Sequence, residues 1–314
     1  MPENKKLVSV IVPVYNEEES LPFLMPRLLS AMEGMKRPFE IIFVNDGSRD
    51  SSLRMLYSFH EANPKKVRII DFNGNFGQHM AIMAGFDHSR GEIVITLDAD
   101  LQNPPEEIPR IVEKIDAGHD VVGTIRQNRQ DPKFRKMASR IVNSITNRIT
   151  GLQLNDYGCM LRGYRRDIVN IINQSFESTT FIPALAQKFA VNPVEIPVTH
   201  SEREHGTSKY SFFRLIRLNF DLMTGFSLYP LQAVTMIGMA VSVLSFLFVL
   251  FLLLRRFIVG PEAEGVFTLL NINFFLMGIT MSCVGIIGEY IGRIYSEVRK
   301  RPRYVIRREW DIND

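Results

Sequence analysis

Several residue types are scarce in this 314-residue chain, and each scarcity excludes a class of protein. The two cysteines, Cys159 and Cys283, form neither a Cys-x-x-Cys pair nor a cluster with histidine, which excludes a disulfide framework and a zinc site. The net charge of +3 is too small to indicate nucleic acid binding. The sequence also contains no internal repeat, so a solenoid is excluded.

Charged residues are missing altogether from two long segments, 222–254 and 265–288. A membrane-spanning helix needs about 20 mostly apolar residues, so each segment is long enough. The alternative is a buried core helix, but residues 241–254 are almost wholly aliphatic or phenylalanine, and only Asn271 and Asn273 dilute the second segment. We therefore predict transmembrane helices at 228–254 and 267–290.

The distribution of charge predicts how these helices are oriented. The first apolar run, 7–14, stops at an acidic stretch after eight residues, too soon for a secretory signal. The loop 255–266 holds two arginines offset by two glutamates, whereas the tail 291–314 is strongly basic. Positive residues favour the cytoplasmic side, so we expect both termini in the cytoplasm and the loop in the periplasm. Basic residues next to the membrane also indicate contact with anionic lipid.

The segment 1–209 shows the alternating pattern of an α/β domain. Short β-branched runs at 8–13, 39–45, 67–72 and 92–97 alternate with helix-length segments at 18–32, 51–61 and 78–88. This pattern predicts a mostly parallel sheet covered on both faces.

The regular alternation of strands and helices fades beyond residue 123. Residues 134–150 form a basic amphipathic pattern, which indicates either a solvated helix over the core or a helix on the membrane, and 210–227 is expected to be interfacial.

Polar clusters follow three of the predicted strands, at residues 15–17, 45–48 and 98–102. Ligands of parallel α/β sheets bind at the carboxyl ends of strands, so these clusters predict an active site. Asp98 and Asp100 stand one residue apart at a strand end, where two carboxylates can hold a hard cation such as Mg²⁺. Gln102 is a plausible third oxygen ligand.

Three motifs are similar to those of a known family: the segment Val10-Ile11-Val12-Pro13-Val14-Tyr15-Asn16-Glu17, the turn Asn45-Asp46-Gly47-Ser48, and the segment 98–106. They resemble the family-2 glycosyltransferases, which have a GT-A fold. The paired C-terminal spans resemble the polyprenyl-phosphate branch of that family. Segments 77–86, 126–131 and 156–162 resemble its members that transfer 4-deoxy-4-formamido-L-arabinose. The resemblance runs from about residue 7 to residue 304.

The resemblance implies a role for each matching residue. The nucleoside of a UDP-sugar would be bound by Pro13, Tyr15, Glu17, Asp46 and Asp98. Mg²⁺ or Mn²⁺ would be bound by Asp98, Asp100 and Gln102, with Asp100 as a direct ligand. Phosphates would be bound by Arg126, Arg135, Arg203 and Lys209, of which the last two also count as catalytic. Asp156 matches a position proposed as a base. A purely structural role is the alternative for three of these motifs. Residues 13–15 could pack a turn, 45–48 could form an Asx turn, and 203–209 could be a juxtamembrane loop.

The implied activity is inverting, metal-dependent transfer of 4-deoxy-4-formamido-L-arabinose from UDP to undecaprenyl phosphate at the bacterial inner membrane. The product would serve lipid A modification and resistance to cationic peptides, and the resemblance implies a homo-oligomer, such as a tetramer. One alternative is transfer of glucose or another hexose. A processive polysaccharide synthase would carry Gln-x-x-Arg-Trp, which is absent around the sole tryptophan, Trp310. An inactive scaffold is disfavoured because the carboxylate and basic motifs are intact.

Overall fold

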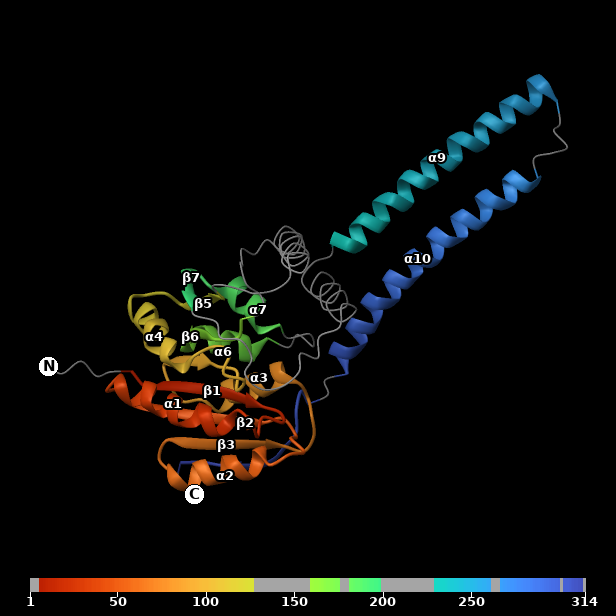
Figure 1. Cartoon of the computed structure of the whole chain (residues 1–314). Helices are drawn as coiled ribbons and strands as arrows, with labels where there is room; N and C mark the ends of the chain where they lie inside the picture. The colour runs from red at the N-terminus through yellow and green to blue at the C-terminus, as the bar shows by residue number, and fades with distance from the viewer. Residues whose placement is uncertain are drawn as a thin grey trace. The chain divides into compact units, whose positions relative to one another are not determined.

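The computed structural model describes residues 6–126, 159–175, 181–198, 229–260, 266–299 and 302–312. The chain divides into two units (Figure 1). One consists of Met1–Phe212 with Arg301–Asp314, and the other is Phe213–Lys300. The expected interfacial segments, 134–150 and 210–227, lie outside the described residues.

The first unit is built on an eight-stranded sheet with the order β7-β5-β6-β4-β1-β2-β3-β8. Its centre consists of four strands that pair in parallel: β1 (Val8–Val14), β2 (Phe39–Asn45), β3 (Val67–Phe72) and β4 (Ile93–Thr96). Nearly every residue of these strands is buried, because helices cover both faces of the sheet. The predicted α/β domain with a mostly parallel sheet is confirmed.

The connecting helices are α1 (Leu21–Gly34), α2 (Ser52–Ala62) and α3 (Gln78–His88). Alternate residues of β1 serve opposite faces of the sheet. Val10 and Val12 belong to a core with α1 and α2, whereas Ile11 faces α3. A Cβ placed on Gly85 of α3 would come within 2.3 Å of the Ile11 side chain, so glycine permits the close contact between helix and strand.

The other half of the sheet contains β5 (Val121–Arg126), β6 (Arg162–Arg165) and β7 (Pro193–Val198). β6 is antiparallel to both β4 and β5, and β7 is parallel to β5. The accompanying helices are η1 (Pro105–Glu107), α4 (Ile108–Asp116), α6 (Arg166–Gln174) and α7 (Ile182–Phe189). The helix α4 follows directly after the Asp98–Gln102 segment and packs in the same core as α1.

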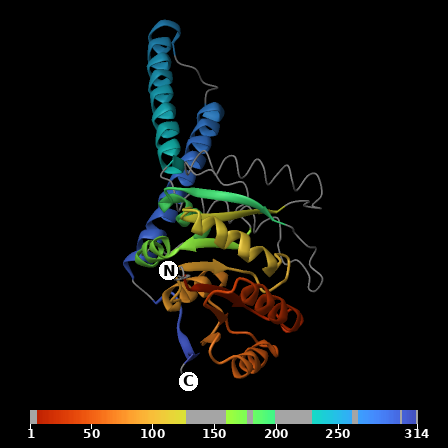
Figure 2. The ribbon, with the colours of Figure 1, turned by 90° about the vertical axis from the view of Figure 1, so that its left-hand side faces the viewer.

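The eighth strand, β8 (Ile306–Trp310), comes from the far end of the chain and pairs antiparallel with β3 (Figure 2, the blue strand near the C-terminus). The charge pattern predicted a basic tail at 291–314, whereas in the structure part of this segment, β8, completes the sheet. Trp310 packs edge-on against Tyr57 of α2, with ring centroids 4.5 Å apart. The pairing satisfies the backbone groups along the outer side of β3 that would otherwise form a free edge.

The second unit contains two long helices, α9 (Tyr229–Val259) and α10 (Val266–Val298). Within the described residues, the segment Ile272–Gly292 is long and apolar enough to cross a membrane. Large apolar side chains of α10 are exposed, among them Phe274, Met281 and Ile291, as expected for a surface that contacts lipid. This supports the second predicted span, and the first stays a prediction.

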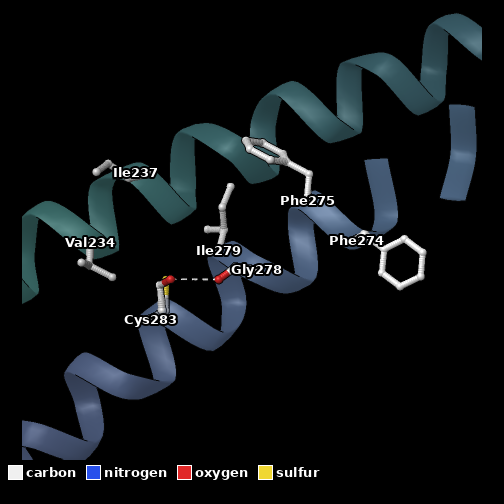
Figure 3. A pocket seen from close by; sticks show the side chains of 8 residues that line it. Val234, Ile237, Phe274, Phe275, Gly278, Ile279 and Cys283 are labelled. Carbon is white, nitrogen blue, oxygen red and sulfur yellow. Dashed lines mark hydrogen bonds between the residues drawn. The ribbon is translucent and has the colours of Figure 1, made fainter. Parts of the chain in front are cut away.

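An apolar groove lies between α9 and α10 (Figure 3). Its lining includes Val234 and Ile237 from α9, and Phe275 and Ile279 from α10. The Ser282 hydroxyl donates a hydrogen bond of 2.9 Å to the carbonyl four residues earlier in the same helix. Its donor is therefore satisfied within α10, as an apolar environment requires.

Candidate active site

The three polar clusters predicted from the sequence all lie at the carboxyl-terminal edge of the sheet. β1 ends at Val14, β2 at Asn45 and β4 at Thr96, and these strands run parallel. The clusters at 15–17, 45–48 and 98–102 directly follow these ends, so the fold brings them to one edge. This edge is where doubly wound α/β sheets bind ligands.

The segment after β1 is tied to the turn after β2 by side-chain hydrogen bonds. Asn16 has a positive φ of 54°, and its side-chain oxygen accepts the Arg49 N–H at 2.8 Å. The Glu17 N–H donates to the Ser52 hydroxyl oxygen at 2.8 Å. Tyr15, two residues after the half-buried Pro13, is 41% exposed, so its ring is accessible to a stacked base.

Asp46 is buried and links the end of β2 to the start of α3. Its two carboxylate oxygens accept the N–H groups of Phe76 at 2.6 Å and Gly77 at 2.9 Å. Burial raises the pKa of Asp46, and the two amide hydrogen bonds act against that rise. Gly47 has a φ of 69°, and a Cβ there would lie 2.6 Å from the backbone of Gly74. Asp46 therefore fixes the loop before α3 in addition to any contact with a nucleoside.

The Asn45 side chain, at the end of β2, is paired with a buried carboxylate. Its amide nitrogen donates a 2.7 Å hydrogen bond to the carboxylate of Asp71 on β3, and both side chains are buried. A carboxylate at position 45 would place two buried negative charges in contact, which is costly. The amide satisfies Asp71 without adding a charge.

The Asp-x-Asp segment after β4 has an unusual backbone. Leu101 adopts a φ of 60°, which is rare for a residue with a branched side chain, and its side chain is buried in the core. Holding a non-glycine residue in this region costs on the order of 1–3 kcal/mol. The Gln102 N–H donates to Asp100 at 3.2 Å, and the Gln78 amide nitrogen donates to Asp98 at 2.5 Å. Each carboxylate thus accepts a hydrogen bond from an uncharged donor.

These residues fit a hard divalent cation. Asp98 and Asp100 supply carboxylate oxygens and Gln102 an amide oxygen, which are the ligand types that Mg²⁺ and Mn²⁺ prefer. Across the described ranges, no group of three or more His, Cys, Asp or Glu side chains is arranged to hold a metal ion. A site with two carboxylates matches a cation that takes its other ligands from a diphosphate and water.

The sequence pattern predicted no role for the first two residues of α3, Gln78 and His79, of which Gln78 contacts Asp98. The Nδ1 atom of His79 is buried and has no hydrogen-bond partner in the described part of the chain. The ring packs edge-on against Phe181, 5.3 Å away. Burial lowers the pKa of His79 to about 4, so the ring is neutral near pH 7. The contacts of Gln78 and His79 could not be predicted from the sequence, because a contact between distant segments leaves no periodic pattern of residues.

The remaining predicted residues are not placed in this site. Asp156, Arg135, Arg203 and Lys209 lie outside the described residues, and so does the side chain of Arg126 at the end of β5. Their predicted roles in phosphate binding and catalysis stay predictions. Cys159, by contrast, is buried and shares a 2.8 Å hydrogen bond with the Thr124 hydroxyl, far from the usual exposed setting of a reactive thiol.

Comparison with known proteins agrees with the motifs. The family model described as glycosyl transferase family 2 matches residues 9–172. The undecaprenyl-phosphate 4-deoxy-4-formamido-L-arabinose transferase of Klebsiella pneumoniae (strain 342) is 53% identical over 305 residues, 96% of this chain and 93% of the relative. The protein of the same name from Edwardsiella ictaluri (strain 93-146) is 50% identical over 303 residues, with the same shares of each chain.

Solved structures of other proteins are similar to this chain. A mycobacterial protein of known structure is 14% identical and has a TM-score of 0.52, covering 70% of this chain and 73% of that one. A mannosyltransferase from Pyrobaculum calidifontis, solved with GDP-Man and Mn²⁺, is 17% identical with a TM-score of 0.49, covering 72% of this chain and 64% of that one. The resemblance in the motifs and the expected GT-A fold are confirmed, and the chain belongs to glycosyltransferase family 2.

Proposed function

We propose that this chain transfers 4-deoxy-4-formamido-L-arabinose from its UDP donor to undecaprenyl phosphate. The observation that carries the proposal is the identity of 53% across 96% of the chain with a relative named for this reaction. The Asp-x-Asp segment at the carboxyl edge of the sheet supplies a site for the donor diphosphate. The product would serve lipid A modification and resistance to cationic peptides.

Different residues would bind different parts of the UDP-sugar donor. Tyr15 offers an exposed ring for the uracil, and Glu17 and Asp46 are carboxylates at the same edge of the sheet that would bind the ribose. Asp98, Asp100 and Gln102 would hold Mg²⁺ or Mn²⁺ against the diphosphate. The cation, when bound, neutralises the charge that develops on the departing UDP.

The acceptor needs positive charge more than it needs a base. A phosphate monoester has a second pKa near ~6, so it is largely dianionic near neutral pH and attacks the anomeric carbon directly. A bond from the phosphate oxygen to that carbon forms while the bond from the carbon to the UDP oxygen breaks, which inverts the configuration. We assign Arg126, Arg135, Arg203 and Lys209 to the phosphates, since two anions must be brought together. Asp156 would position the sugar or the acceptor.

The donor sugar is tested directly with the purified full-length protein. UDP-4-deoxy-4-formamido-L-arabinose, UDP-glucose and further UDP-hexoses are each mixed with undecaprenyl phosphate, and the lipid products are identified by mass spectrometry. We expect the formamido sugar to be transferred with the highest kcat/KM. Preferred transfer of glucose would replace the donor assignment with the hexosyl alternative. No lipid-linked product from any donor would contradict the transferase proposal as a whole.

The location that we propose is the bacterial inner membrane, with the first unit and both termini in the cytoplasm. β8 supports this arrangement because it follows α10 in the chain yet pairs with β3 of the first unit. The chain segments before α9 and after α10 must therefore be on the same side of the membrane. If both helices span the bilayer, the loop between them faces the periplasm. We also expect a homo-oligomer, such as a tetramer.

This topology predicts the outcome of cysteine labelling in intact cells. In a background with Cys159 and Cys283 replaced by serine, Ala263→Cys in the loop should react with a membrane-impermeant maleimide. Glu61→Cys on α2, which is exposed on the first unit, is the matched control and should react only after the cells are opened. Labelling of position 263 only in opened cells would place the loop in the cytoplasm and reverse the topology.

A second prediction concerns the basic loop before the membrane. Arg203→Ala and Lys209→Ala should each lower turnover by about 10²-fold, because each removes a charge that stabilises the phosphates in the transition state. Membrane yield should stay near that of the parent, as should the activity of the control Lys65→Ala at an exposed position. Turnover within about twofold of the parent in both variants would leave the loop with a structural role only.

A further inference from the structure

We propose that Gln78 is a positioning residue that fixes the orientation of Asp98 for binding the complex of divalent cation and UDP. The observation is the 2.5 Å hydrogen bond from the Gln78 amide nitrogen to Oδ1 of Asp98, between the first residue of α3 and the end of β4. The inference rests on the proposed function, since it names a second residue that acts on the same donor site.

The backbone that carries Gln78 is held in place on both sides. Asp46 accepts the N–H groups of Phe76 and Gly77, which fixes the loop immediately before α3. The carbonyl of Gly77 then accepts the N–H groups of Met80 at 3.0 Å and Ala81 at 3.1 Å, so the helix begins at a defined residue. A side chain on such a fixed backbone can orient its partner with little loss of conformational freedom.

The backbone next to Asp98 is fixed by strand pairing. The neighbouring Leu97 N–H donates to the Ile11 carbonyl at 3.0 Å, which extends the pairing of β4 with β1 to the residue before Asp98. The Leu97 side chain is fully buried. The hydrogen bond from Gln78 acts on the Asp98 carboxylate itself and favours one orientation of it.

The chemistry of the donor at position 78 suits a metal ligand. An amide donates a hydrogen bond without adding charge, so Asp98 keeps its full negative charge for a cation. A lysine or arginine at this position would also donate, but its positive charge would compete with the metal ion. A glutamate would have no proton to donate near neutral pH. Glutamine is therefore the long side chain that orients the carboxylate and leaves its charge available.

The test uses the full-length protein with Mn²⁺ and UDP as the probes. In Gln78→Met the side chain keeps nearly the same length and loses only its hydrogen-bonding groups. We expect the affinity for Mn²⁺ in the presence of UDP, measured by electron paramagnetic resonance, to fall about tenfold, the scale typical of residues that orient metal ligands. The KM for the UDP-sugar at low Mn²⁺ should rise in parallel, and excess Mn²⁺ should restore turnover.

The matched control is Gln174→Met, which changes an exposed glutamine at the end of α6 and should leave both affinities unchanged. Mn²⁺ affinity of Gln78→Met within twofold of the parent would overturn the positioning role. An equal loss of UDP binding with and without Mn²⁺ would also overturn it, since Gln78 would then contact the nucleotide itself. UDP lacks the sugar, so a wrong donor assignment appears only in the donor panel and leaves this result intact.

Discussion

Asp100→Asn is expected to abolish sugar transfer while the protein still folds and inserts. Asp100 lies in the loop that follows β4, at the edge of the sheet where the polar clusters meet, and it is half-buried. Asparagine preserves the shape and the contact with the Gln102 N–H but removes the negative charge that holds a divalent cation. Loss of one such electrostatic contact lowers turnover by about 10²–10³-fold, and loss of the cation lowers it further.

The measurement is single-turnover transfer at saturating donor, with and without excess EDTA. Asp116→Asn is the control, because Asp116 is an exposed carboxylate at the end of α4 that pairs with Arg37. Its activity should match that of the parent. Excess EDTA should abolish the transfer activity of the parent enzyme, and added Mg²⁺ or Mn²⁺ should restore that activity. Normal turnover in EDTA, or in Asp100→Asn, would show that the Asp-x-Asp segment does not bind a metal ion.

Arg68→Met is expected to lower the free energy of unfolding by about 3–5 kcal/mol, the usual cost of leaving a buried charge without its partner. Arg68 lies on β3 with a side chain that is 3% exposed, and it contacts Glu40 on β2 at 3.0 Å. It also reaches two acidic residues at the end of the chain, Glu309 at 3.1 Å and Asp311 at 2.9 Å. Without Arg68, the Glu40 carboxylate, 1% exposed, loses its buried cation.

The free energy of unfolding can be measured by the fluorescence of the sole tryptophan, Trp310. Trp310 packs on Tyr57 and lies beneath the Arg308 guanidinium, so its fluorescence reports whether β8 is paired. Arg110→Met, at a position 52% exposed, is the control and should change stability by less than about 0.5 kcal/mol. Combining Arg68→Met with Glu40→Gln should recover much of the loss, because the unpaired buried charge is then gone. Equal stability of parent and Arg68→Met would show that the ion-pair group contributes little.

The parallel half of the sheet can be predicted from the sequence, because its strands are buried on both faces. Val8–Val14 is a run of apolar and small side chains in which only Pro13 is not fully buried, and one of the polar clusters begins where this run stops. A strand that helices cover on both faces is mostly apolar, and the ligand site lies at its carboxyl end.

The other strands could not be predicted from the sequence, because they form only through pairing with segments that are distant in the chain. β6 has the sequence Arg-Gly-Tyr-Arg, and its fully buried Arg162 donates through Nε to the Cys159 carbonyl at 2.9 Å. No hydrophobic pattern predicts a strand with a buried arginine. β8 contains two arginines and a glutamate, and only the free edge of β3 makes it a strand. The hydrogen bond between Gln78 and Asp98 is equally hard to predict from the sequence, since it joins the start of α3 to the loop after β4, 20 residues away.

The position of β8 also sets an order for biosynthesis. The hydrogen bond from Arg68 to Glu309 joins residues 241 positions apart, with both long helices between them. Chains are made from the N-terminus, and domains generally begin to fold during synthesis. The edge of β3 therefore stays open until the helical hairpin has left the ribosome. The first unit is completed only after α9 and α10 have been made, so a chain that stops before residue 306 leaves β3 with an unpaired edge and Arg68 without Glu309 and Asp311.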